Sequence, residues 1–189
     1  YCRREARNQI IQALTYRESA FLFDYFLHLS FETKRRTWKM YSKEEIKKQI
    51  IEAVNTVKAT NPMAGSITNS VTINFVANAQ LAVGGSAAMV YLPDEGEFLA
   101  NAGGATYINV GTLMPIYEET LPRTAKALYE AGKPWVLDPV AIGIGELRTK
   151  LLSEFKQYKP SIIRGNASEV IALAGFWGLE GGEGESKVR

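Results

Sequence analysis

Two side chains that often carry chemistry are almost absent from this chain. The 189 residues include one cysteine, Cys2, and one histidine, His28, so residues 40–189 contain neither. A single cysteine excludes a disulfide within the chain and a metal cluster built on cysteines. Residues 40–189 also lack the groups for a Ser-His-Asp triad, a Cys-His pair or a zinc site of the usual ligands. We expect His28, which lies in an aromatic stretch, to serve packing rather than chemistry.

Long apolar runs and a strong net charge are missing as well. No run reaches the roughly 20 residues of a membrane-spanning helix, and Asp24 and His28 interrupt the most apolar stretch near the start, which does not resemble a signal peptide. The formal net charge is only +2, which gives no indication of nucleic-acid binding. We therefore expect a cytoplasmic protein that binds neither a membrane nor nucleic acid.

Residues 1–39 differ in composition from the rest of the chain. They hold eight of the 20 aromatic residues, and eight Lys or Arg against four Asp or Glu. From Met40 the pattern becomes regular, because Ser42 and Glu45 form a capping-box signature at the start of a helix. We expect the natural domain to begin at Met40, and residues 1–39 to be an extension or a wrongly joined upstream piece. The alternative is an N-terminal helical hairpin that packs on the domain.

From residue 42 onward, helical periodicity alternates with short apolar runs. Such alternation predicts β-α-β units and an α/β fold of three layers around a mainly parallel sheet. The predicted strands are 64–67, 86–91, 105–110, 135–138 and 160–164. The predicted helices are 42–59, 70–83, a short one from 93, 114–132, 146–158 and 167–174, with loop over 178–189.

The stretch 65–78 combines a short strand, a polar turn and the start of a helix. Thr68, Asn69 and Ser70 all suit a helix N-cap. The free backbone N–H groups of such a turn can hold a polar ligand or an anion. An ordinary capped helix explains the same pattern, and capped helices are more common than ligand sites.

Polar residues also follow the other predicted strands, where a parallel sheet binds its ligands. Asp138 stands before Pro139 at a strand end, where it either forms a turn or holds Mg²⁺ through water. Glu169 follows Asn166 by three residues, which suits either a capping box or a second carboxylate for the same metal. Arg164 leaves an apolar strand, so we expect it to bind phosphate or a local carboxylate. No G-x-x-x-x-G-K-[ST] motif is present, and no G-x-G-x-x-G motif opens a helix. If the protein binds a nucleotide, its binding site is therefore neither a P-loop nor a Rossmann-type glycine-rich turn.

Four motifs in unbroken order resemble the hydroxyethylthiazole kinases, which are ribokinase-like enzymes. The resemblance runs from about residue 40 to residue 175 and rests on Ile67–Asn78, Asn109–Leu113, Val136–Val140 and Arg164–Glu169. It implies a kinase that phosphorylates the hydroxyl of 4-methyl-5-(2-hydroxyethyl)thiazole with ATP and Mg²⁺ in thiamine biosynthesis. It also implies a homotrimer with active sites between subunits.

The resemblance assigns roles to individual positions. Asn69, Val71, Met89 and Gly111 fall where the family lines its thiazole pocket. Arg164 and Asn166 fall in the ATP-binding region, and Asp138 and Glu169 match the family's Mg²⁺-associated carboxylates. Two positions depart from the family pattern, since Gly65 replaces a frequent histidine and Ala141–Ile144 replaces a glycine-rich loop.

The family's catalytic group and glycine-rich anion hole belong to a C-terminal portion that would follow Arg189. We therefore expect residues 40–189 to be the N-terminal portion of the kinase domain, and the 189-residue chain alone to have little or no kinase activity. Two alternatives stay open. One is a ribokinase-like kinase of another small alcohol, such as a pyrimidine or a sugar. The other is a non-catalytic assembly module built from half a domain.

Overall fold

A computed structural model of the chain describes residues 41–179. The chain divides into two units, Tyr1–Thr56 and Val57–Arg189, and all the elements discussed below except helix α3 lie wholly in the second. Helix α3 (Lys43–Thr60) begins with the expected capping box, in which Ser42 N donates to Glu45 Oε2 and Glu45 N donates to Ser42 Oγ. The predictions for residues 1–39 and for His28 lie outside the described residues.

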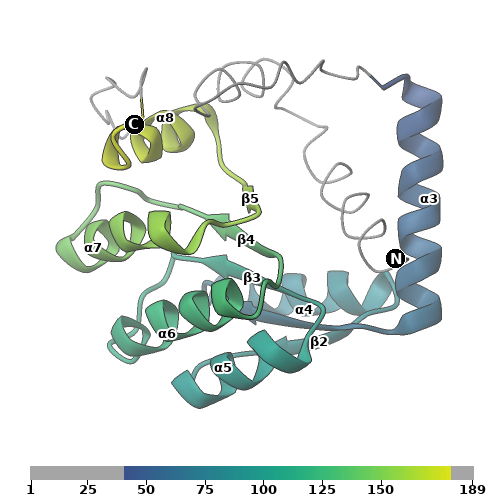
Figure 1. The fold of residues 1–189 in the computed structure, drawn as a ribbon, viewed down its shortest axis with the longest axis horizontal. Coiled ribbons are helices and arrows are strands. Elements are labelled where there is room, and N and C mark those ends of the chain that lie inside the picture. The colour runs from purple at the N-terminus through teal and green to yellow at the C-terminus, as the bar shows by residue number, and fades with distance from the viewer. Residues whose placement is uncertain (1–40, 180–189) are drawn as a thin grey trace. The chain divides into compact units, whose positions relative to one another are not determined.

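Five strands form one parallel sheet, as the sequence predicts (Figure 1). Their order is β2-β1-β3-β4-β5, and each neighbouring pair runs parallel. The carboxyl ends of all five strands therefore lie along one edge of the sheet. The strands are β1 (Met63–Ile67), β2 (Ser86–Met89), β3 (Ala105–Asn109), β4 (Trp135–Asp138) and β5 (Ile162–Ile163).

Helices cover both faces of this sheet. The step from β1 to β2 runs opposite to the later steps, so right-handed crossovers place α4 on one face and α5, α6 and α7 on the other. Figure 1 shows this arrangement, with α4 behind the strands and the other three in front. The bounds are α4 (Ile73–Ala82), α5 (Pro93–Ala102), α6 (Tyr117–Glu130), α7 (Glu146–Glu154), a 3₁₀ turn (Phe155–Tyr158) and α8 (Ala167–Phe176).

The hydrophobic core lies between the sheet and helices α5 to α7. Trp135 and Phe155 are almost completely buried there, and their rings meet edge to face with centroids 5.6 Å apart. The indole N–H of Trp135 donates to Tyr158 O at 3.2 Å, so its one polar group is satisfied inside the core. Leu121, Leu128 and Leu137 fill the space around them. This packing anchors β4, whose last residue is Asp138.

Several element boundaries differ from those expected. Helix α4 starts at Ile73 rather than residue 70, because residues 69–72 form a turn around the side chain of Asn69. Helix α6 starts at Tyr117 rather than residue 114, and β5 has two residues rather than five. The helix over 146–158 ends in a 3₁₀ turn that Lys159 closes with a φ of 46°. None of the described helices is long and apolar enough to cross a membrane.

We predict that Gly96→Ala destabilises the contact between α5 and α6. A Cβ at this position would lie 1.9 Å from Thr124 Oγ1 and 3.1 Å from Thr124 Cβ, and Thr124 is buried. The clash should outweigh the better helix propensity of alanine and lower the free energy of unfolding by about 1–3 kcal/mol. Denaturant unfolding of the variant measures this loss.

The matched variant is Gly96→Ala with Thr124→Ala, which removes the side-chain atoms that clash. The double variant should lose less stability than the two single losses added together. Strict additivity, or a Gly96→Ala chain as stable as the original, would contradict this account of the helix contact.

Candidate active site

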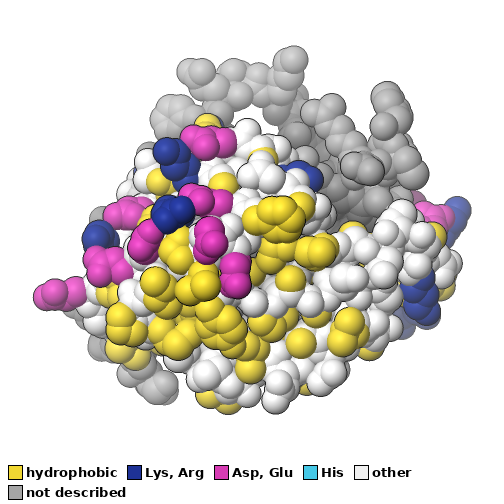
Figure 2. All heavy atoms as spheres, turned by 90° about the horizontal axis from the view of Figure 1, so that it is seen from below, with side chains coloured by type: hydrophobic (Ala, Val, Ile, Leu, Met, Phe, Trp, Pro, Cys, Tyr) yellow, Lys and Arg dark blue, Asp and Glu magenta, His cyan; other side chains and the backbone are white. Residues whose placement is uncertain are grey.

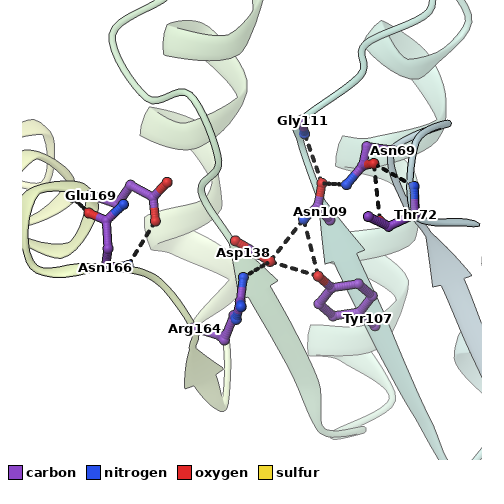
Figure 3. Close-up of polar contacts among 9 residues, drawn as sticks. All are labelled: Asn69, Thr72, Tyr107, Asn109, Gly111, Asp138, Arg164, Asn166 and Glu169. Atoms are coloured by element: carbon purple, nitrogen blue, oxygen red, sulfur yellow. Dashed lines mark hydrogen bonds and ion pairs between the residues drawn. The ribbon is translucent and has the colours of Figure 1, made fainter. Parts of the chain in front are cut away.

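Asn109, at the end of β3, joins polar residues from two neighbouring strands (Figure 3). Its Oδ1 accepts from Asn69 Nδ2 at 3.0 Å and from the backbone N–H of Gly111 at 2.9 Å. Its Nδ2 donates to Asp138 Oδ2 at 2.8 Å and to the hydroxyl of Tyr107 at 3.1 Å. These partners fix which end of the amide faces which strand. The expected convergence of Asn69 and Asp138 at one edge of the sheet is therefore present.

Asp138 is fully buried, and its two carboxylate oxygens have different surroundings. Oδ2 accepts from Tyr107 Oη at 2.7 Å, from Asn109 Nδ2 at 2.8 Å and from Arg164 Nη1 at 2.9 Å. Oδ1 has no hydrogen-bond partner within residues 41–179. A buried carboxylate oxygen without a partner is costly and points to a ligand, an ion or a water. Tyr107, Asn109, Asp138 and Arg164 are called the polar cluster below.

Charge and burial determine the protonation states of Tyr107 and Arg164 in the polar cluster. The carboxylate of Asp138 raises the pKa of the Arg164 guanidinium, mainly through direct charge attraction. Burial, followed by the hydrogen bond to Asp138, raises the pKa of the Tyr107 phenol. Tyr107 therefore stays protonated and donates to Asp138 throughout the physiological pH range. The Arg164 side chain is 67% exposed, in contrast to its buried partner, so most of its donors face outward.

The cluster lies on the face of the sheet that α4 covers. Gln80 of α4 donates to Ser66 Oγ, and Ser66 is the register partner of Tyr107. Register partners in a parallel sheet face the same side, and alternate residues of one strand do so too. Thr68, at the end of β1, continues the series on this face, and its buried hydroxyl also lacks a partner within the described residues.

Asn69 organises the turn between β1 and α4. Its Oδ1 accepts from the backbone N–H groups of Val71 and Thr72 and from Thr72 Oγ1, at 3.0–3.1 Å. The N-cap position itself is Thr72, whose side chain makes no capping bond, so the expected N-cap among residues 68–70 is wrong. The acceptor of Asn69 is occupied, and among residues 41–179 its Nδ2 bonds to Asn109 alone, so the side chain keeps one N–H for a ligand.

Gly111 is required by the close approach of two asparagines. A Cβ there would lie 2.9 Å from Asn109 Oδ1 and 3.1 Å from Asn69 Cβ. Arg148 of α7 holds the same loop, because its guanidinium donates to the carbonyls of Val110 at 3.0 Å and Gly111 at 3.3 Å. Burial lowers the pKa of this guanidinium. The loop after β3 is thus fixed from both sides.

Asn166 and Glu169 form a capping box at the start of α8. Asn166 Oδ1 accepts from Glu169 N at 2.9 Å, and Asn166 N donates to Glu169 Oε2 at 2.8 Å. One carboxylate oxygen of Glu169 is therefore occupied by a backbone group. Figure 3 shows this pair beside the polar cluster rather than within it. Within the described part of the chain, no group of three or more His, Cys, Asp or Glu side chains is placed to hold a metal.

Met89 and Val71 are more exposed to solvent than the fully buried Asp138 of the polar cluster. Met89 lines a pocket of about 480 Å³ between the end of β2 and α5, together with Phe98 and Leu99 of α5. Val71 is 88% exposed, and Phe98 is also largely exposed. Figure 2 shows that hydrophobic side chains gather over a broad area of the face on which α5 lies. These residues do not enclose a ligand within the described part of the chain.

Sequence reasoning left three contributors to the site without a role. Tyr107 precedes Asn109 by two residues, so strand periodicity places both on one face, and this signal was available. The sequence places Asn109 among the polar residues at the strand ends and in a family motif, but it does not indicate that Asn109 bonds to Asn69 and Asp138. Arg148 gave no usable signal, because a single arginine on a helix is typical of a solvated surface.

Comparisons with known proteins point to a single family. The model of the hydroxyethylthiazole kinase family matches residues 54–185. The hydroxyethylthiazole kinase of Bifidobacterium adolescentis is 58% identical over 130 residues, which cover 69% of this chain and 44% of that protein. The enzyme of the same name from Leptospira interrogans is 46% identical over 138 residues, which cover 72% and 51%.

A solved structure is also similar. The hydroxyethylthiazole kinase protein from Pyrococcus horikoshii OT3 matches with a TM-score of 0.63 and 37% sequence identity, covering 68% of this chain and 50% of that chain. The present chain thus spans about half the length of these relatives.

We predict that Ala141→Gly stabilises the loop that follows Asp138. Ala141 has a φ of 59°, in the left-handed region that favours glycine. Relief of this strain should raise the free energy of unfolding by about 1 kcal/mol, as measured by denaturant unfolding. The matched control is Ala79→Gly in the exposed interior of α4, which should lose about 1 kcal/mol. Equal losses in both variants would contradict the assignment of strain to Ala141.

Proposed function

The chain belongs to the hydroxyethylthiazole kinase family, and we propose that the protein transfers the γ-phosphate of ATP to the hydroxyl of 4-methyl-5-(2-hydroxyethyl)thiazole. The observation that carries this proposal is the bridging position of Asn109. Its hydrogen bonds connect Asn69 and Gly111 with Asp138, which in turn pairs with Arg164. The family resemblance implies a thiazole pocket at the first two residues, Mg²⁺ at Asp138 and ATP at Arg164. The two substrates of a kinase must meet at such a junction.

Arg164 is suited to the phosphates of ATP. Nη1 bonds to Asp138, and the side chain is 67% exposed, so its other N–H groups, which bond to no described residue, can meet a phosphate oxygen. The start of α8, after Asn166, adds backbone N–H groups nearby that favour an anion. In our proposal Arg164 and Asn166 bind the phosphate chain, as the family resemblance implies.

The buried and unpartnered Oδ1 of Asp138 fits a role in binding Mg²⁺. Mg²⁺ retains several waters and usually takes one or two carboxylates together with phosphate oxygens, so a larger acidic cluster is not required. We assign Asp138 as the principal carboxylate, and Glu169 as a second one through the oxygen that the capping box leaves free. When bound, the ion supplies neutralisation of phosphate charge.

The thiazole is expected to lie beside Asn69 and Gly111. The remaining N–H of Asn69 offers one donor, and Val71 and Met89 add apolar surface, a combination that suits a neutral heteroaromatic alcohol. Arg148 and Asn109 keep the Gly111 loop in place for this contact.

A second copy of the chain is needed to enclose this substrate. Val71 is 88% exposed, and the pocket at Met89 is open to solvent. An apolar ligand gains little from surfaces that remain in water. We therefore propose that a neighbouring subunit covers these residues in a homotrimer, as the family resemblance implies.

The second candidate is a ribokinase-like kinase of another small alcohol. The loop at Ala141–Ile144 favours it, since this loop departs from the family pattern, contains a strained Ala141 and buries Ile142. Comparison of kcat/KM for the thiazole alcohol, a hydroxymethylpyrimidine and a sugar distinguishes the two candidates. The proposed function requires the thiazole alcohol to be preferred.

The kinase proposal is tested in a chimera in which residues 54–185 replace the matched part of the Bifidobacterium adolescentis relative. This chimera should phosphorylate the thiazole alcohol, whereas the 189-residue chain alone should show little or no turnover.

Asp138→Asn and Arg164→Met in the chimera should each lower kcat/KM by at least about 100-fold, because both groups neutralise phosphate charge. A coupled ADP-release assay measures the rates.

Lys126→Gln serves as the matched control, since the ion pair of Lys126 with Glu130 on α6 is exposed and its loss should leave the rate unchanged. An Asp138→Asn chimera as active as its parent would contradict the proposed site. Rapid turnover by the isolated 189-residue chain would contradict the prediction that it is inactive alone.

A further inference from the structure

Tyr107 and Asn109 hold one oxygen of Asp138 from the neighbouring strand. The two residues lie two positions apart on β3, so they face the same side of the sheet. Tyr107 Oη donates to Asp138 Oδ2 at 2.7 Å, and Asn109 Nδ2 donates to that oxygen at 2.8 Å. Asn109 Nδ2 also donates to Tyr107 Oη at 3.1 Å, which fixes the direction of the phenolic hydroxyl.

These contacts make the carboxylate of Asp138 strongly asymmetric. A carboxylate has about four acceptor sites on its two oxygens. Three donors, from Tyr107, Asn109 and Arg164, all meet Oδ2. Oδ1 is buried without a partner in the described residues, so the only open acceptor points away from β3.

We propose that Tyr107 is a positioning residue that, with Asn109, fixes the Asp138 carboxylate so that Oδ1 is the oxygen presented to the metal–nucleotide. This inference rests on the proposed function, because it assumes that Asp138 serves a metal-bound nucleotide. Tyr107 itself contacts neither substrate. Its effect reaches the ligand only through the orientation of Asp138.

Arg164 cannot perform this task alone. Its side chain is 67% exposed, and the proposed function requires it to turn toward phosphate. When Arg164 engages a phosphate, Oδ2 keeps the two donors on β3, whose backbone is paired with β1 and β4. Tyr107 and Asn109 therefore hold the carboxylate in place in both the empty and the loaded site.

The experiment uses Mn²⁺ as the probe and the whole 189-residue chain as the protein. Paramagnetic broadening of amide NMR signals, followed during a Mn²⁺ titration, gives the midpoint for binding near Asp138. Tyr107→Phe keeps the ring and removes the donor, so it should raise this midpoint roughly tenfold, as loss of a group behind a metal ligand typically does. Tyr129→Phe, at an exposed ring on α6, should leave the midpoint unchanged.

Each outcome decides between the inference and the function. A raised midpoint in Tyr107→Phe, with thermal unfolding close to that of the original chain, supports the positioning role, since a purely structural role would move stability and not the midpoint. An unchanged or lower midpoint overturns the role of Tyr107 while leaving Asp138 as the metal-binding carboxylate. If no signals near Asp138 broaden, or if the broadening persists in Asp138→Asn, both the inference and the assigned metal site are overturned. The kinase assay of the chimera tests the proposed function separately.

Discussion

The buried carboxamide of Asn109 is the contact on which the arrangement of this site depends. Its oxygen is occupied by donors from Asn69 and Gly111, and its nitrogen by acceptors on Tyr107 and Asp138. Asn109 is only 3% exposed, so water does not replace any of these partners easily. A buried amide that loses a partner costs free energy, and this cost keeps the three strand ends in one relative position.

The parallel sheet explains why such a cluster forms here and not elsewhere. Strand bodies such as Leu137 and Ile108 are buried and apolar, whereas the backbone N–H and C=O groups at the strand ends must find other partners. Side chains at these ends meet because the strands run in one direction. The result is a fully buried Asp138 that pairs with an exposed Arg164, so the negative charge is buried and the positive charge faces outward. That combination suits a site that receives phosphate and releases it.

Sequence reasoning identified the fold and the principal charged residues. Alternating periodicity predicted all five strands and their parallel direction, and the strand-end positions of Asn69, Asp138 and Arg164 predicted that they converge. The reasoning failed where tertiary contacts override local preference. The side chain of Asn69 accepts a hydrogen bond from the backbone N–H of Thr72, and α4 therefore begins only at Ile73.

Partners across strands were the hardest contacts to predict. The register pairs Asn109, and not Tyr107, with Asp138, so Tyr107 reaches the carboxylate diagonally through its long side chain, and the sequence does not indicate this contact. The Arg148 guanidinium donates to three backbone carbonyl groups. Every residue has such a carbonyl, so the sequence does not indicate these contacts. For Glu169 the sequence allows a helix cap or a metal-binding carboxylate. The capping contact is present, and the metal role stays a proposal.

The most direct measurement of the central claim is a crystal structure of the chimera with Mg²⁺ and a non-hydrolysable ATP analogue. The account predicts that Oδ1 of Asp138 faces the metal, either directly at about 2.1 Å or through one coordinated water, with Oδ2 still bonded to Tyr107 and Asn109 and with Arg164 on a phosphate oxygen. A nucleotide bound away from these strand ends, or a metal held by Oδ2 with the Tyr107 contact broken, would contradict it.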